Sequence, residues 1–243
     1  MVKSSCLSST HCYESIILLS WKFLIIIFNC FFEVLTLGSK YFCIGFNKTG
    51  TTSVEKSFSS FGLSLGDQAT SEMLVFDWAK GEFDRILRFC ETADAFQDIP
   101  FSLPGTYKHL YKQYPEAKFI LTVRDSSEQW FDSLVRFHTK VFSSQKMHIP
   151  TEGDLNNSLY RYKGYSLDVI KILYNYPEIP LYDRLSYIDK YEQHIVDVLD
   201  FFQDKPESLL VINVSEEDAY NKLADFVGVN VDKRMSFPWE NRT

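Results

Sequence analysis

The feature that most limits the fold of this chain is a short apolar run that enters a glycine-containing loop and continues as a helix. Residues 40–46 (KYFCIGF) have the apolar character of a buried strand, and residues 47–50 (NKTG) form the loop. Residues 51–61 (TTSVEKSFSSF) follow with helical spacing, and Gly62 is expected to cap their carboxyl end. This strand–loop–helix unit predicts an α/β protein.

The rest of the chain repeats the alternation of strand and helix. We expect strands at 93–99, 118–123 and 209–214, helices at 73–90, 107–114, 126–142, 188–202 and 216–227, and an irregular, tyrosine-rich insertion at 143–185. Short connections between alternating elements favour an open, mostly parallel β-sheet flanked by helices on both faces, which makes three layers. In such folds the ligand lies beyond the carboxyl ends of the strands.

Charge and cysteine content narrow the range of ligands. The net charge is −7, from 25 basic and 32 acidic side chains, so the overall field argues against a protein that binds nucleic acid nonspecifically. An anionic ligand must then be held by a local cluster of donors. The 5 cysteines form no CxxC pair and no zinc-type spacing with histidine, so we expect no metal.

The first 39 residues differ from the remainder. Residues 16–37 (IILLSWKFLIIIFNCFFEVLTL) are long enough to span a bilayer and lack a signal-peptide cleavage site. The interpretation is a single-pass membrane anchor at 1–39 followed by a domain at 40–243. Lys22, Asn29 and Glu33 disfavour insertion. The alternatives are an apolar helix packed on a cytoplasmic domain or a misassigned translation start.

The loop after the first strand has the composition of an anion site. A helix that begins directly after a strand directs unpaired N–H groups and the positive end of its dipole to one point. Gly50 allows close backbone approach, Lys48 adds a charge, and Thr51, Thr52 and Ser53 add hydroxyl donors. The alternative is an ordinary turn in which a hydroxyl caps the helix. Lys48 precedes Gly50, so this is not the GxxxxGK[ST] motif of nucleoside-triphosphate sites.

A second anion site is predicted after the strand at 118–123. Arg124 can offer a planar pair of donors to a phosphate, and Ser133 lies about two turns along the following helix. The alternative is a surface ion pair of Arg124 with Asp125 or Glu128, leaving Ser133 solvated.

Together these segments resemble the sulfotransferases. The resemblance rests on GFNKTGTTS between a strand and a helix, and on KFILTVRD…W…S about 75 residues later. The most similar subgroup is compact, with an acidic residue near a proline after its second strand (DIP at 98–100), a strand of the LLVINV type and a KLADFVG-like helix. The resemblance covers about residues 40–239 and implies a P-loop NTPase-like fold.

The resemblance also implies an activity and its residues. The donor would be 3′-phosphoadenosine 5′-phosphosulfate (PAPS), whose sulfuryl group passes to an acceptor hydroxyl or amine without a metal. The donor-binding residues would be Lys48, Gly50, Thr51, Thr52, Ser53, Arg124 and Ser133. Ser133 follows the arginine by nine positions where many relatives have eight, and Ser126 replaces a frequent proline.

Catalysis by this route needs a group that stabilises the charge on the leaving phosphate oxygen, and a base that removes the acceptor proton. Lys48 is the candidate for the leaving oxygen, and Asp98 is the candidate base because it ends the second strand near the donor loop. Asp98 could instead cap the turn before Pro100. His138 is the second candidate base.

Other functions remain open at this point. A P-loop phosphotransferase or nucleotide kinase would need magnesium and a hydroxyl directly after the loop lysine in the right glycine frame. A non-catalytic module could bind PAPS or another nucleotide without turnover. The acceptor could be a small molecule or a glycan, with tyrosines of the insertion (160, 162, 165, 174 and 176) shaping its pocket.

Overall fold

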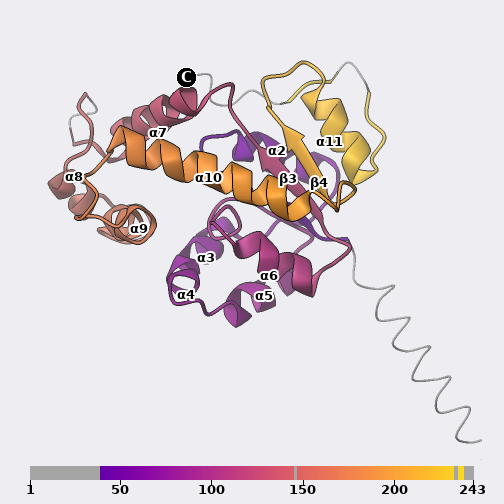
Figure 1. Ribbon diagram of the computed structural model, residues 1–243, viewed down its shortest axis with the longest axis horizontal. Coiled ribbons are helices and arrows are strands. Elements are labelled where there is room, and N and C mark those ends of the chain that lie inside the picture. Colours follow the sequence, from indigo (N-terminus) through magenta and orange to yellow (C-terminus); the bar gives the residue numbers. More distant parts are fainter. Residues whose placement is uncertain (1–38, 145–146, 233–234, 238–243) are drawn as a thin grey trace, which may run out of the picture. The chain divides into compact units, whose positions relative to one another are not determined.

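Parallel strands form the centre of the protein (Figure 1). The computed structural model describes residues 39–144, 147–232 and 235–237, and these contain four strands: β1 (Tyr41–Cys43), β2 (Ala95–Phe96), β3 (Lys118–Thr122) and β4 (Leu209–Ile212). Their order in the sheet is β2-β1-β3-β4, and each neighbouring pair is parallel. The winding direction reverses between β1 and β3, which is where α/β sheets of this kind bind ligands.

Helices connect the strands and cover the sheet. They are α2 (Thr51–Ser60), α3 (Gln68–Met73), α4 (Val75–Ala79), α5 (Asp84–Phe89), α6 (Thr106–Gln113), α7 (Ser127–Phe142), α8 (Glu152–Asn157), α9 (Tyr165–Tyr174), α10 (Arg184–Phe202) and α11 (Ala219–Val227), with a 3₁₀ turn at Cys90–Thr92.

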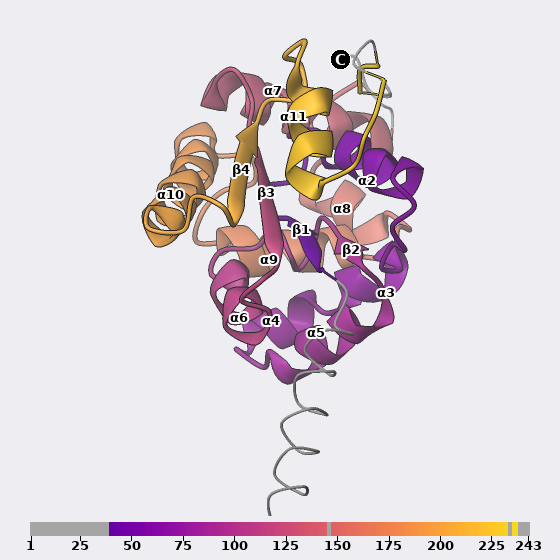
Figure 2. The same ribbon diagram turned by 90° about the vertical axis from the view of Figure 1, so that its right-hand side faces the viewer.

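The two faces of the sheet bury different side chains of the same strands. In β1 and its extension, Phe42 and Ile44 pack in a core with α5, α6 and α10, whereas Tyr41 and Cys43 pack in a second core with α2 and α11. Successive strand residues point to opposite faces, so a strand covered on both sides must be apolar throughout. Figure 2 shows the helices on both sides of the sheet. The predicted three-layer, P-loop NTPase-like α/β fold is confirmed.

The single helix predicted over 73–90 is wrong. The range contains the last residue of α3 and the whole of α4 and α5, and Gly81, with a φ of 73°, lies in the turn between α4 and α5. The N–H of Glu82 bonds back to the carbonyl of Asp77 at 2.9 Å, which closes the turn. Leu74 before α4, Trp78 in α4 and Ile86 in α5 pack in one core, so the apolar spacing continues across the break and imitates one helix.

The insertion at 143–185 is not irregular throughout, because it contains α8 and α9. Thr151 and Asp154 form a reciprocal capping box at the start of α8, with bonds of 3.2 and 2.9 Å. Leu167, Ile170 and Tyr174 of α9 pack in a core shared with α7 and α10. The insertion is therefore an ordered part of the domain that packs against α7 and α10.

The predicted membrane anchor at 16–37 lies outside the described residues. Within the described ranges, none of the helices has the combination of length and hydropathy that a bilayer crossing requires. The chain from Ser39 onward forms one compact unit.

Candidate active site

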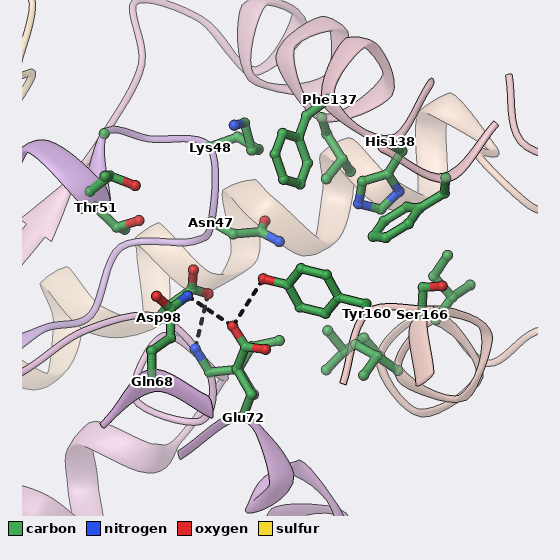
Figure 3. A pocket seen from close by; sticks show the side chains of 18 of the residues that line it. Asn47, Lys48, Thr51, Gln68, Glu72, Asp98, Phe137, His138, Tyr160 and Ser166 are labelled. Carbon is green, nitrogen blue, oxygen red and sulfur yellow. Dashed lines mark hydrogen bonds between the residues drawn. The ribbon is translucent and has the colours of Figure 1, made fainter. Parts of the chain in front are cut away.

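A cavity of about 270 Å³ opens where the strands end (Figure 3). Segments that follow β1, β2 and β3 contribute Lys48, Asp98 and Arg124 to its wall, and α7 and α9 supply the opposite wall. All of the predicted site residues except Ser133 line this cavity. Residues from distant parts of the sequence therefore meet at the edge of the sheet where ligands were expected.

The loop after β1 is held by donors from α7 and from the segment that follows β3. The indole Nε1 of Trp130 donates to the carbonyl of Asn47 at 3.0 Å, and Nε of Arg124 donates to the carbonyl of Lys48 at 2.6 Å. These bonds engage two loop carbonyls and couple the donor loop to the arginine at the end of β3. Arg124 therefore both holds the loop and lines the cavity.

A buried threonine that the sequence analysis did not single out fixes the same loop to β3. Thr49 is fully buried, and its hydroxyl lies 2.5 Å from both the Phe46 carbonyl and the Thr122 hydroxyl. At Gly45 a Cβ atom would lie 2.1 Å from the Thr122 hydroxyl oxygen, so only glycine fits this close approach. The sequence does not distinguish Thr49 from Thr51, Thr52 and Ser53, which also carry hydroxyls. The structure does, because Thr49 is buried in the fold and the other three line the cavity.

The amino end of α2 is open toward the cavity. Gly50 precedes the helix with a φ of 102°, and no side chain of the described residues caps this end. The first N–H groups of a helix have no partner within it, and the helix dipole makes this end attractive to anions. Thr51 and Thr52 line the cavity here. A Cβ at Gly50 would lie 2.4 Å from a Val214 methyl, which explains the glycine.

Lys48 brings a second positive group to this end of the cavity. Its ammonium nitrogen lies 3.9 Å from the centre of the Phe137 ring, and Figure 3 shows the two side chains together. Partial burial, followed by the charge of Arg124, lowers the pKa of Lys48, and the charge of Asp98 opposes this. Because the two cations repel each other, a bound anion would stabilise both.

Asp98 lies in the same cavity with an unusual backbone and an unusual pKa. Its φ is 60°, in the left-handed region that Asp and Asn tolerate better than most residues, and Oδ1 accepts a bond from the N–H of Ile99 at 2.9 Å. Burial, and next the charge of Glu72, raise the pKa of Asp98 to about 6, although the Ile99 bond and Lys48 act against this. A carboxyl with this pKa is ionised at neutral pH and can accept a proton.

Glu72 is a site residue that the sequence analysis missed. Its carboxylate is almost fully buried and accepts bonds from Gln68 Nε2 at 2.8 Å, Arg161 Nε at 2.5 Å and the Tyr160 hydroxyl at 3.4 Å. Figure 3 shows Glu72 next to Asp98, with Tyr160 directed toward it. The network ties α3 to the insertion. Nothing in the local sequence distinguishes Glu72 from a surface glutamate.

His138 lines the opposite wall and is neutral. Its Nδ1 lies 3.0 Å from the Tyr182 hydroxyl. Burial, with a smaller contribution from the charge of Lys48, lowers the pKa of His138 to about 3. A histidine with this pKa is a weak base, so the geometry and charge of the cavity favour Asp98 over His138 for proton removal.

Ser133 does not face the cavity. It is buried on α7, and its hydroxyl has no hydrogen-bond partner among the residues that the structure describes. The proposed contact of Ser133 with a 3′-phosphate therefore stays a prediction.

The described residues contain no group of three His, Cys, Asp or Glu side chains arranged to hold a metal ion.

A parallel sheet, a glycine-containing loop and an open helix end beside a lysine define an α/β protein with a P-loop-like fold, in which such a helix end suits an anion. Residues 40–243 match the family model described as the sulfotransferase domain, so the chain belongs to this family. Its activity class is sulfuryl transfer. A comparison with curated proteins gives no match.

Proposed function

We propose that this protein transfers the sulfuryl group of PAPS to a hydroxyl or amine of an acceptor molecule. One observation carries the proposal: the open end of α2, with Lys48 and Arg124, shares a cavity with a carboxyl, Asp98, whose pKa is raised to about 6. The groups that would bind the anionic donor and the group that would accept the proton of the acceptor therefore lie in the same cavity.

The residues at this end of the cavity suit the two anionic groups of PAPS. The N–H groups at the start of α2, the hydroxyls of Thr51 and Thr52, and Lys48 offer donors to a 5′-phosphosulfate. Arg124 donates from Nε to the loop carbonyl, and its two terminal nitrogens form no hydrogen bond with the described residues, so they can donate to a 3′-phosphate. When bound, PAPS supplies a sulfuryl group already activated by its bond to phosphate.

The protein's own residues then have two tasks besides alignment. Asp98 accepts the acceptor's proton as the acceptor oxygen or nitrogen forms its bond to sulfur. Lys48 offsets the negative charge on the phosphate oxygen as the bond between sulfur and that oxygen breaks. The proton ends on Asp98, and the electron pair ends on the departing phosphate.

Calorimetry of the full chain with 3′-phosphoadenosine 5′-phosphate (PAP), the desulfated donor, tests the proposal. We expect saturable heat of binding that is the same with magnesium and with excess EDTA, because positive side chains and N–H groups hold the phosphates. Absence of heat with PAP, together with magnesium-dependent binding of ATP, would instead indicate a phosphotransferase. PAP binding without transfer to any acceptor would indicate a non-catalytic module.

The pH dependence of transfer should respond to Glu72. The rate should rise with pH through about 6, since Asp98 must be ionised to act as a base. In Glu72→Gln the rise should move to lower pH, because the negative charge that raises the pKa of Asp98 is removed while the shape of the side chain is kept. The measurement is kcat/KM against pH at saturating donor.

The matched control for this variant is Glu82→Gln, which removes one negative charge from an exposed residue just beyond α4. Its pH profile should coincide with that of the unmodified protein. An unchanged profile in Glu72→Gln would mean that Asp98 does not set the pH dependence.

A further inference from the structure

The cavity has two chemically different halves. The half near α2 holds the donor loop and Arg124. The other half is formed by α7 and α9, and six apolar side chains contribute to its wall: Leu134, Phe137, Phe142, Val169, Ile170 and Leu173. Leu134 and Ile170 are buried although they line the cavity, and the other four side chains are partly buried, so this half is an apolar recess. We refer to these six residues as the apolar recess.

The apolar recess offers no charge to a ligand. Of the described residues that line the cavity, the charged ones are Lys48, Arg124, Asp98 and Glu72, and none of them belongs to α7 or α9. Glu72 is engaged by Arg161 and Gln68. A sulfated or carboxylated sugar needs cations around its own charges, and a neutral sugar needs many hydrogen-bond partners.

The polar groups next to the recess are few and neutral. His138 is held by the Tyr182 hydroxyl, and Ser166 bonds to the Ser158 hydroxyl at 2.5 Å and to the Leu155 carbonyl at 3.3 Å. Much of the polar capacity here is already used within the protein. The whole cavity measures about 270 Å³, just below the ~300–1,000 Å³ that is typical of ligand sites.

We infer that the acceptor is an uncharged small molecule with an apolar skeleton and a hydroxyl group, bound in the apolar recess with the hydroxyl directed to Asp98. This inference rests on the proposed sulfuryl transfer and specifies its acceptor. Burial of an apolar ring against Phe137, Phe142 and Leu173 supplies the binding free energy. The acceptor oxygen bonds to sulfur, the bond from sulfur to phosphate breaks, and the proton passes to Asp98.

The two neighbouring carboxylates disfavour an amine. Glu72 lies close enough to Asp98 that its negative charge contributes to the raised pKa of the Asp98 carboxyl. The same negative field would keep an ammonium protonated, and a protonated nitrogen has no lone pair with which to attack sulfur. A neutral hydroxyl needs no prior loss of a proton to enter the apolar recess.

An acceptor panel with radiolabelled PAPS and the full chain tests the inference. The probes are a naphthol, cyclohexanol, naphthylmethylamine, a neutral disaccharide and a heparin tetrasaccharide. We expect kcat/KM for the naphthol to exceed that for either saccharide and for the amine at least about 100-fold, the discrimination that a few buried apolar contacts can supply. A saccharide or the amine as the preferred substrate would overturn the inference.

PAP calorimetry on the same preparation separates failure of the inference from failure of the function. If PAP binds and neither the naphthol nor cyclohexanol is sulfated, the acceptor class is wrong and donor binding stands. If PAP does not bind, the proposed function itself fails, and the acceptor assignment fails with it.

Substitutions locate the acceptor within the cavity. Phe142→Ala, in the apolar recess, should raise KM for the naphthol about tenfold and leave the affinity for PAP unchanged, since it removes apolar contact area on the acceptor side only. Val169→Ala is a second, smaller truncation in the same recess. The control is Val141→Ala, which alters the neighbouring residue, 43% exposed and outside the cavity wall. Unchanged KM in both Phe142→Ala and Val169→Ala would place the acceptor elsewhere.

Discussion

Replacing Lys48 with alanine is expected to lower the rate of sulfuryl transfer at saturating donor by about 10²–10³-fold, the usual effect of losing one group that stabilises transition-state charge. The amine lies over the Phe137 ring at the cavity and forms no ion pair with the residues that the structure describes, so the variant should fold normally. Alanine and lysine are both L-residues with a side chain, so the φ of 67° is equally strained in both. The measurement is kcat, supported by thermal unfolding.

Two further variants separate charge from shape in this experiment. Lys140→Ala removes an exposed lysine on α7 whose charge also lowers the pKa of Lys48, and it should retain normal turnover. Lys48→Arg keeps the positive charge and should recover part of the lost activity. If the kcat of Lys48→Ala is within about threefold of that of the unmodified protein, Lys48 does not stabilise the charge on the leaving oxygen.

The parts of the fold that could be predicted are those with local causes. The first strand–loop–helix unit was predictable because a buried strand must be apolar on both faces and a tight loop needs glycine. The strand at Lys118–Thr122 was found for the same reason. Because parallel strands bring their carboxyl ends to one edge, the meeting of Lys48, Asp98 and Arg124 followed from the topology.

The parts that could not be predicted depend on contacts between distant residues. The ion pair of Glu72 with Arg161 joins residues 89 positions apart, and neither residue lies in a recognisable pattern. The break at Gly81 was hidden because Trp78 before it and Ile86 after it pack in the same core. Likewise, Ser133 follows the predicted helical spacing, yet its burial depends on how α7 packs.

Backbone strain gives an independent indication of where function lies. Within the described residues, four that are not glycine have positive φ: Lys48, Asp98, Asn175 and Tyr182. The first two line the cavity, and Tyr182 holds His138, which also lines it. Such conformations cost about 1–3 kcal/mol each and persist where the surrounding structure imposes them, often at functional sites. The backbone strain at Lys48 and Asp98 therefore supports the same functional assignment as their charges and their positions in the cavity.

Asp98→Asn should abolish most transfer and at the same time stabilise the protein. Loss of the base is expected to lower kcat/KM by about 10²–10⁴-fold. Asparagine tolerates the φ of 60° and can keep the bond from the Ile99 N–H, so the backbone should not change. The measurements are transfer kinetics and the free energy of unfolding as a function of pH.

The direction of the stability change follows from the raised pKa. The folded protein holds the proton of Asp98 up to a pH of about 6, whereas the unfolded chain releases it near 3.8, so ionisation disfavours the folded state increasingly as the pH rises between these values. The full cost is up to ~3 kcal/mol, at 1.36 kcal/mol per pKa unit. Asparagine avoids it, and the advantage of the variant should be absent below pH 4 and complete above pH 6.

Asp94→Asn is the control with the opposite expectation. Ser64 donates hydrogen bonds from its hydroxyl and its N–H to the Asp94 carboxylate, which lower the pKa of Asp94, so the ionised form stabilises the fold and its loss should weaken it above the unfolded pKa. Asp94 is outside the cavity wall, and its variant should retain turnover. A carboxylate whose pKa is raised by burial destabilises the folded protein when it is ionised, whereas a carboxylate that accepts hydrogen bonds stabilises the folded protein. If Asp98→Asn and the unmodified protein have equal stability at every pH, the fold does not raise the pKa of Asp98. That result would contradict its role as a base tuned by the cavity, even if the variant is slow.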